Sequence, residues 1–323
     1  MSRRRWGDRF AILGQSIPLS RYTAGIELTT TSAVTELSEA DLVGFCSGMF
    51  PKELTHDRFV NEARFGLSRV LGVLPSVAPS SVKILEVGAG SCMLSAYLAS
   101  KRLHVTAVEP LGPEFDFFLP LQRRVLEFCQ HQGIELKLLR VAGEELNLPA
   151  QFDVVFTINA LEHMRDPLRT IDNMYKSLKP GGIALVHCPN YTMPFDSHFN
   201  ILLVTRSKRI NEWLHQSKIN RYPQVWNELN FVRYSEVRQH LMNRRVNFSF
   251  DRSIMREMVV RLIDDPVFAE RMPPIIHTIG ALLRHTRLVR ALNCVPARFQ
   301  TPMEVRIKKE DGPSPPDPPR AED

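Results

Sequence analysis

The chain has 323 residues, of which 44% are hydrophobic and 24% charged, which is enough to bury the core of one large domain or two small ones. No stretch reaches the roughly 18 apolar residues of a membrane-spanning helix, and the apolar stretch near the amino terminus is too short for a secretion signal. The five cysteines lack C-x-x-C spacing, which argues against a zinc site or a disulfide framework. The sequence therefore predicts a soluble protein of the reducing cytoplasm.

Basic residues are concentrated in the carboxyl-terminal third of the chain. Residues 201–310 contain 20 Lys and Arg against 10 Asp and Glu, whereas residues 1–200 contain 20 against 21. Such a region suits an anionic substrate, a membrane surface or nucleic acid, and a solvated face accounts for it as well. The charge leaves the partner open, with peripheral membrane contact among the alternatives.

Two segments near the amino terminus, at 38–50 and 55–75, have apolar residues at helical spacing. From residue 82 onward, short apolar runs alternate with helical patterns, which is typical of a parallel sheet with helices on both faces. The expected strands are 82–88, 104–110, 134–143, 152–159 and 183–190, and the expected helices between them are 91–102, 112–133 and 166–182.

The remaining sequence completes a predicted α/β, Rossmann-like fold with a mostly parallel seven-stranded sheet. Segments 246–250 and 303–309 are the expected last two strands. We expect a helical amino-terminal extension at 1–80, a main domain at 81–310 and a disordered, proline-rich tail at 311–323. Within the main domain, the core spans 82–200 and a helical insertion spans about 252–300.

A glycine-rich turn follows the first expected strand, in the sequence ILEVGAGSC. Gly88 and Gly90 permit a tight turn, and the next helix offers unpaired N–H groups to an anion. A dinucleotide fingerprint would need glycine or alanine where Met93 stands, and a phosphate loop would need G-K-[ST]. Both nucleotide-binding motifs are therefore disfavoured, and Cys92 is expected to be a small, buried, unreactive residue.

These residues resemble the class I S-adenosylmethionine-dependent methyltransferases. The family's first motif, an acid followed by spaced glycines, matches Glu86, Gly88 and Gly90, and departs from the pattern at the third glycine. Glu109 ends the second strand, Glu144 precedes the fourth, and INALEHM and LKPGG follow in the family's order. The resemblance covers about 120 residues, from residue 82 to roughly residue 198.

The resemblance implies S-adenosylmethionine as cofactor and assigns it a set of residues. It implies that Glu109 binds the ribose hydroxyls and that Glu144 reaches the adenine amino group. The full predicted cofactor-binding set is Glu86, Gly88, Gly90, Glu109, Glu144, Glu145 and Asn159.

The sequence favours a small-molecule methyl acceptor. The Asn/Asp-Pro-Pro-aromatic motif of adenine amino-methylating enzymes is missing after the fourth strand, and CPNY lies one strand too late. A Pro-Cys pair for cytosine-carbon methylation is missing as well, which argues against nucleic acid. O-methylation is the preferred reaction. An RNA or lipid-surface methyltransferase, or an inactive methyltransferase-like binding subunit, is the alternative, and neither acceptor identity nor oligomeric state is predicted.

Two histidines are candidates for the catalytic base. His163 follows the fourth strand within NALEHM and is favoured, whereas His198 lies on a later loop with Tyr191 and Asp196. Similar quinone O-methyltransferases bind a divalent metal through an acid three residues before a Glu-His pair. That position is Asn159 in this chain, so one carboxylate is lost and no metal is predicted.

Overall fold

The computed structural model describes residues 37–50, 57–110, 118–269, 274–286 and 288–311. The first 36 residues and, apart from Asp311, the tail predicted to be disordered lie outside the described residues. Among the described helices, none has the length and apolar character needed to cross a membrane.

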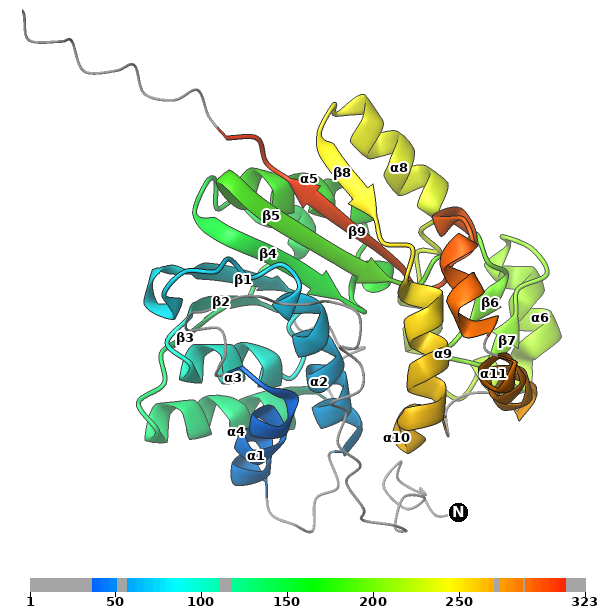
Figure 1. The fold of residues 1–323 in the computed structure, drawn as a ribbon, viewed down its shortest axis with the longest axis horizontal. Helices are drawn as coiled ribbons and strands as arrows, with labels where there is room; N and C mark the ends of the chain where they lie inside the picture. Colours follow the sequence, from blue (N-terminus) through cyan, green and yellow to red (C-terminus); the bar gives the residue numbers. More distant parts are fainter. Residues whose placement is uncertain (1–36, 51–56, 111–117, 270–273, 287, 312–323) are drawn as a thin grey trace, which may run out of the picture.

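A seven-stranded sheet with the order β3-β2-β1-β4-β5-β9-β8 forms the centre of the molecule (Figure 1). Strands β1 to β5 are parallel, and β9 runs antiparallel to both β5 and β8. This confirms the predicted mostly parallel sheet and its last two strands. The strands are β1 Lys83–Val87, β2 His104–Val108, β3 Leu136–Leu139, β4 Phe152–Ile158, β5 Leu178–Cys188, β8 Asn247–Phe250 and β9 Met303–Lys308.

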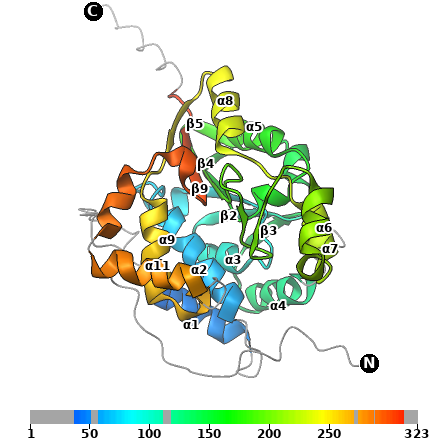
Figure 2. The same cartoon turned by 90° about the vertical axis from the view of Figure 1, so that its right-hand side faces the viewer.

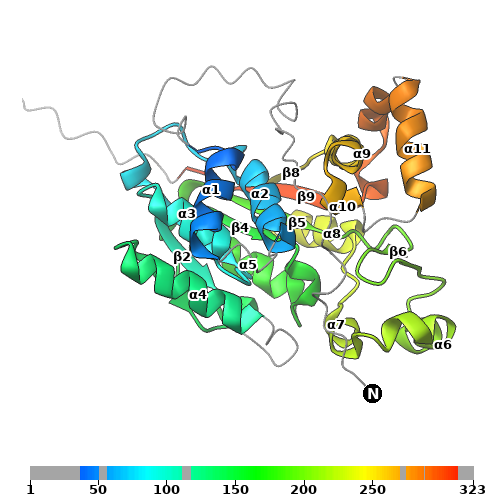
Figure 3. The same cartoon turned by 90° about the horizontal axis from the view of Figure 1, so that it is seen from below.

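Helices cover both faces of this sheet (Figure 3). Successive residues of a strand point to opposite faces, so Ile84 packs with helices α1 to α4 while Leu85 packs with α5 and α8. The helices are α1 Glu39–Met49, α2 Asp57–Leu71, α3 Met93–Ser100, α4 Phe118–His131, α5 Pro167–Ser177, α6 Lys208–Ile219, α7 Pro223–Glu228, α8 Tyr234–Asn243, α9 Ile254–Asp264, α10 Pro266–Ala269 and α11 Pro274–His285.

The helix before β5 ends earlier than the sequence indicates. The glycine pair at 181–182 was expected to mark its end, but α5 stops at Ser177 and the glycines lie within β5. Pro180 is poorly suited to a helix interior, and Gly181 and Gly182 exchange backbone hydrogen bonds with Lys309 beyond β9. Pairing with the neighbouring strand therefore determines where this helix ends.

A small unit follows β5 beyond the carboxyl ends of the strands. Residues 190–230, here called the β6–α7 unit, contain the hairpin of β6 Phe195–Asp196 and β7 Ile201–Leu202, followed by α6 and α7. The unit has its own apolar core around Trp226 and Phe199. Figure 2 shows it beside the sheet, on the opposite side from α9 and α11.

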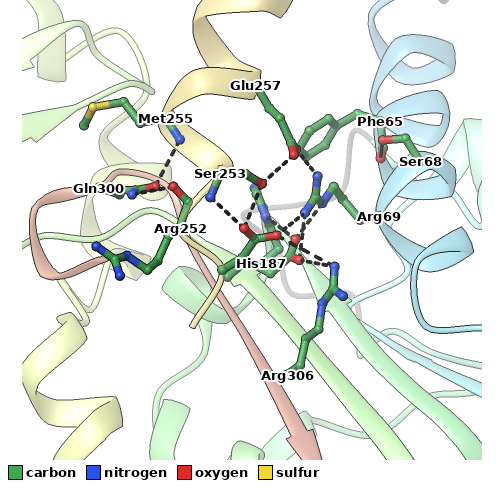
Figure 4. Close-up of polar contacts among 12 residues, drawn as sticks. Phe65, Ser68, Arg69, His187, Arg252, Ser253, Met255, Glu257, Gln300 and Arg306 are labelled. Carbon is green, nitrogen blue, oxygen red and sulfur yellow. Dashed lines mark hydrogen bonds and ion pairs between the residues drawn. The ribbon is translucent and has the colours of Figure 1, made fainter. Parts of the chain in front are cut away.

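Helices α9 to α11 occupy the connection between β8 and β9, and a buried ion network attaches α9 to the sheet (Figure 4). Arg69 of α2 donates to both carboxylate oxygens of Glu304 in β9, at 2.6 and 2.8 Å, and also bonds to Glu257 of α9. His187 of β5 lies 3.2 Å from Glu304, which is fully buried. Burial opposes ionisation, but the bonds to His187 and Arg69 prevail and lower the pKa of Glu304 to about 2.

We expect the substitution Arg69→Met to destabilise the protein by about 3–5 kcal/mol, because it leaves the Glu304 carboxylate buried without its main partner. The lowered pKa of Glu304 means that its contribution is complete above about pH 4.5 and is lost as the pH falls toward about 2. The difference between wild type and variant should therefore shrink in acid. Urea unfolding across this pH range measures it.

Arg64→Met on the same helix is the matched control. Arg64 pairs with Glu39 at 3.3 Å, and both side chains are partly exposed. Loss of this pair should cost less than about 1 kcal/mol. Equal losses in the two variants would contradict a special role for the buried network.

Candidate active site

The glycine turn after β1 is held closely against its neighbours. Gly88 and Gly90 have φ angles of +80° and +50°, and the Gly88 N–H donates to the carbonyl of Val108 at the end of β2. A Cβ on Gly88 would lie 2.4 Å from the Cβ of Ala160, just after β4. Only glycine fits here, so the turn and the loop after β4 lie in direct contact.

Two buried acids flank this turn. The Gly90 N–H donates to Glu109 at 2.7 Å, while Glu86 at the end of β1 accepts a hydrogen bond from Ser95 of α3. Both carboxyl groups are 8% exposed. Burial, together with the nearby Glu109 charge, raises the pKa of Glu86 to about 8 despite the bond from Ser95. The glycine turn, the start of α3 and the two buried carboxyl groups lie together. This arrangement fits a cofactor that carries hydroxyl and cationic groups.

Cys92 has an unusual backbone at the start of α3. Its φ of +62° lies in the left-handed region that a third glycine would adopt freely. The thiol is fully buried, and the Gln122 amide donates to its sulfur at 3.4 Å. Burial and the Glu86 charge raise the pKa of this thiol far above its ordinary range, which fits the expected inert residue.

The other three residues predicted to bind the cofactor differ in environment. Glu144 is buried in a 3-10 turn and accepts from Arg165 at 3.2 Å, whereas Glu145 has an exposed side chain 3.5 Å from the same guanidinium. Asn159 is exposed directly after β4, with a φ of +51°, and its N–H donates to the carbonyl of His187. Glu144 therefore lies within the fold, and Glu145 and Asn159 at its surface.

The structure brings the two candidate histidines together. His163 ends the 3-10 turn at 161–163, His198 follows β6, and their rings lie 5.1 Å apart in an edge-to-face arrangement. The carboxylate of Glu162 faces both, with its Oε1 3.9 Å from Nε2 of His163 and 3.8 Å from Nε2 of His198. Glu162 is fully buried, and within the described residues its oxygens accept no hydrogen bond.

Asp196 orients His198. The fully buried Asp196 lies 3.2 Å from Nδ1 of His198, and it accepts from Tyr191 at 2.8 Å. Burial opposes ionisation, but these bonds outweigh it and the pKa of Asp196 lies below its ordinary value. An ionised Asp196 accepts a hydrogen bond from the Nδ1–H group of His198, which keeps the ring proton on Nδ1 and leaves Nε2 facing Glu162.

Burial shifts the acidity of the remaining members of this cluster. It raises the pKa of Glu162 to about 7, although the His198 charge opposes the shift. Burial, reinforced by His198, lowers the pKa of His163 to about 3. His163 is therefore neutral at physiological pH and a poor proton acceptor, while Glu162 titrates near neutrality.

The same three residues have metal-ligand spacing. One ligand atom from each of Glu162, His163 and His198 lies within 4.8 Å of the others. The sequence gives no metal prediction because Asn159 replaces the acid expected before Glu162 and His163, but the fold adds His198 to that pair. If an ion binds, these three side chains would hold it, since two imidazoles and one carboxylate are a common set for transition metals.

Sequence reasoning missed three supporting residues. Ser95 donates to Glu86, and the Gln122 amide donates to the carbonyl of Gly90. Asn230 donates to the carbonyls of Leu161 and Met164 at 2.8 Å each. Ser95 has a recognisable position one turn into the helix after the glycines. Gln122 and Asn230 come from distant segments, and no local pattern marks them.

Comparison with known proteins relates this chain to methyltransferases. Residues 85–184 match a family model described as a methyltransferase domain. An uncharacterised protein of Mycobacterium tuberculosis is 30% identical over 258 residues, which cover 77% of this chain and 85% of the relative. A ubiquinone biosynthesis O-methyltransferase of Rickettsia conorii is 27% identical over 113 residues, or 35% of this chain and 37% of the relative.

Among solved structures, an S-adenosylmethionine-dependent methyltransferase of Mesorhizobium loti superposes with a TM-score of 0.47 at 13% identity, over 76% of this chain and 98% of that one. The matched family model covers strands β1, β2 and β4 and the glycine turn between buried acids. The chain therefore belongs to the class I S-adenosylmethionine-dependent methyltransferases, with S-adenosylmethionine as its cofactor.

Proposed function

We propose that the protein transfers a methyl group to a hydroxyl oxygen of a small molecule. The observation that carries this proposal is the Asp196–His198 pair facing a buried carboxylate beside the loop after β4. Transfer to oxygen needs a group that removes the hydroxyl proton, and an imidazole oriented by a buried acid supplies one. Similarity to ubiquinone O-methyltransferases over 35% of the chain adds support.

When bound, S-adenosylmethionine supplies an electrophilic methyl group on a sulfonium. In the proposed step, Nε2 of His198 takes the hydroxyl proton while the acceptor oxygen forms its bond to the methyl carbon. S-adenosylmethionine would supply the methyl group, and its sulfur would keep the electron pair of the carbon–sulfur bond as the sulfonium became a neutral thioether. The fully buried Asp196 stabilises the imidazolium that forms.

His198 is the better candidate for the base, in contrast to the preference drawn from sequence. Burial and the neighbouring His198 lower the pKa of His163 to about 3, so His163 is a poor proton acceptor. His198 has the fully buried Asp196 3.2 Å from its Nδ1, which fixes the ring and leaves Nε2 for the hydroxyl of the acceptor. His163 then packs beside His198 and limits how the acceptor lies.

For the cofactor, we propose that the turn at Gly88 and Gly90 accommodates the methionine part near Glu86. Glu109 would hold the ribose and Glu144 the adenine, with Asn159 at the rim. Glu145 is the weakest member of the set because its side chain is exposed and faces Arg165. Nucleic acid remains disfavoured as acceptor, since the motifs of base-methylating enzymes are missing from the sequence.

The test of function is methyl transfer from labelled S-adenosylmethionine to a panel of phenols, catechols and amines. Labelled methyl ethers of the phenols or catechols support the proposal. Labelled amine products alone would contradict O-methylation, and tight cofactor binding without transfer to any acceptor would favour an inactive binding subunit.

Glu109→Ala should weaken S-adenosylmethionine binding by about 1.5–3 kcal/mol, because charged hydrogen bonds to the ribose hydroxyls are lost. Calorimetric titration measures this affinity. Glu127→Ala, on an exposed position of α4, is the control and should bind normally. Unchanged affinity in the Glu109 variant would contradict the proposed ribose contact.

His198→Ala should slow single-turnover methylation by roughly 10²–10⁴-fold at unchanged cofactor affinity, as expected for loss of a general base. Asp196→Asn should slow it to a smaller extent by disfavouring the imidazolium. His163→Ala should act mainly on acceptor affinity.

Two results would reassign these roles. A larger rate loss in His163→Ala than in His198→Ala would make His163 the base. A wild-type rate that disappears on chelation and returns with a divalent ion would assign the cluster to metal binding.

Glu162→Gln should change how stability depends on pH. Because burial raises the pKa of Glu162 to about 7, the folded state retains a proton that the unfolded chain releases at about pH 4.5. The free energy of unfolding therefore falls as the pH rises from about 4.5 to 7 and stays low above that. The variant lacks this loss and should be about 1–3 kcal/mol more stable than wild type near pH 8.

Urea unfolding near pH 5 and pH 8 measures both profiles, with Glu127→Gln as the exposed control. Parallel profiles for wild type and Glu162→Gln would indicate that water reaches this carboxylate.

A further inference from the structure

Exposed apolar side chains are concentrated in one short segment of the β6–α7 unit. Of the ten large hydrophobic residues that are exposed in the described chain, five lie between residues 202 and 214. Trp213 is 78% exposed, the highest value among them. This group, here called the α6 patch, consists of Leu202, Val204, Ile210, Trp213 and Leu214.

The side chains of the α6 patch are held together by the geometry of α6 and the segment before it. Ile210, Trp213 and Leu214 follow i, i+3, i+4 spacing and share the outer face of α6, while Asn211 and Ile219 are buried on its inner face. The preceding segment is tied to the helix, since His215 lies 2.9 Å from the carbonyl of Leu202 and the Val204 N–H donates to Asn211. The inner face of the helix packs into the unit through Asn211 and Ile219, whereas the apolar side chains of the outer face are exposed.

The segment that carries the patch is basic. Residues 201–223 contain one acid, Glu212, whose carboxylate accepts from the indole of buried Trp226 at 2.7 Å. Arg209 and Trp213 also line a cavity of about 310 Å³ between α6 and α7. The basic residues of this segment are Arg206, Lys208, Arg209, Lys218 and Arg221.

We propose that the α6 patch docks the protein on the surface of an anionic lipid bilayer. An exposed tryptophan among aliphatic side chains, with lysine and arginine at the rim, matches the apolar boundary and negative headgroups of such a surface. The aliphatic side chains enter the acyl boundary, the indole lies at headgroup level, and the basic rim pairs with lipid phosphates.

Charge argues against a second copy of the chain, or its own amino-terminal segment, as the partner of this surface. In a symmetric dimer through the patch, the basic rims of the two copies would face each other. The amino-terminal 36 residues contain five arginines and three acids, so they carry the same sign of charge as the rim. An anionic bilayer complements both the apolar centre and the rim. This docking does not rest on the proposed methyl transfer to oxygen.

Co-sedimentation with vesicles tests the proposal. The full chain should bind phosphatidylcholine vesicles that contain roughly one quarter phosphatidylglycerol, and bind pure phosphatidylcholine about tenfold less well or more weakly still. Trp213→Ala and Leu202→Asp should each weaken binding by about tenfold. Arg209→Gln should weaken it about fivefold, and high salt should weaken it further.

Leu282→Asp is the matched control, because Leu282 of α11 is 61% exposed and Leu202 is 58% exposed. It should bind vesicles like the wild type, and all variants should keep their affinity for S-adenosylmethionine, which shows that they are folded. The proposal is overturned if wild type does not prefer anionic vesicles, or if Leu282→Asp loses as much binding as Leu202→Asp. It is also overturned if sedimentation shows a dimer that Trp213→Ala disrupts while vesicles bind neither protein.

Discussion

The contact between Gly88 and Ala160 is the constraint on which the rest of the site depends. With a virtual Cβ–Cβ distance of 2.4 Å, no other residue allows the turn after β1 to lie against the loop after β4. One side of this contact carries Glu86 and, through the Gly90 N–H, Glu109. The other side leads directly into Glu162 and His163. A single missing methyl group thus places the cofactor side and the acceptor side within one site.

All the acids compared here are buried, and their hydrogen-bond partners decide whether the pKa of each is raised or lowered. Asp196 and Glu162 are both fully buried, yet hydrogen bonds keep the pKa of Asp196 low while the pKa of Glu162 rises to about 7. The pKa of Glu304 is lowered in the same way, because Arg69 and His187 bond to its carboxylate. Buried acids that accept several hydrogen bonds therefore stay ionised in this fold, whereas Glu162, which accepts none among the described residues, has a pKa near neutrality.

The strands and the cofactor-side acids were predictable because local patterns encode them. Apolar runs ending in glycine or an acid mark β1 and β2, and the position of Glu109 follows from the end of its strand. Features that arise from tertiary contact were not predictable. The end of α5 at Ser177 and the meeting of His198 with Glu162 both depend on segments distant in sequence.

The β6–α7 unit connects the acceptor side of the site to the molecular surface. Its inner residues Tyr191, Asp196 and His198 form a hydrogen-bonded chain, while its outer helix carries Trp213. The apolar core between them, centred on Trp226, links the two faces through a few packed side chains. The same small core therefore supports both the helix that carries the α6 patch and the segment that positions His198.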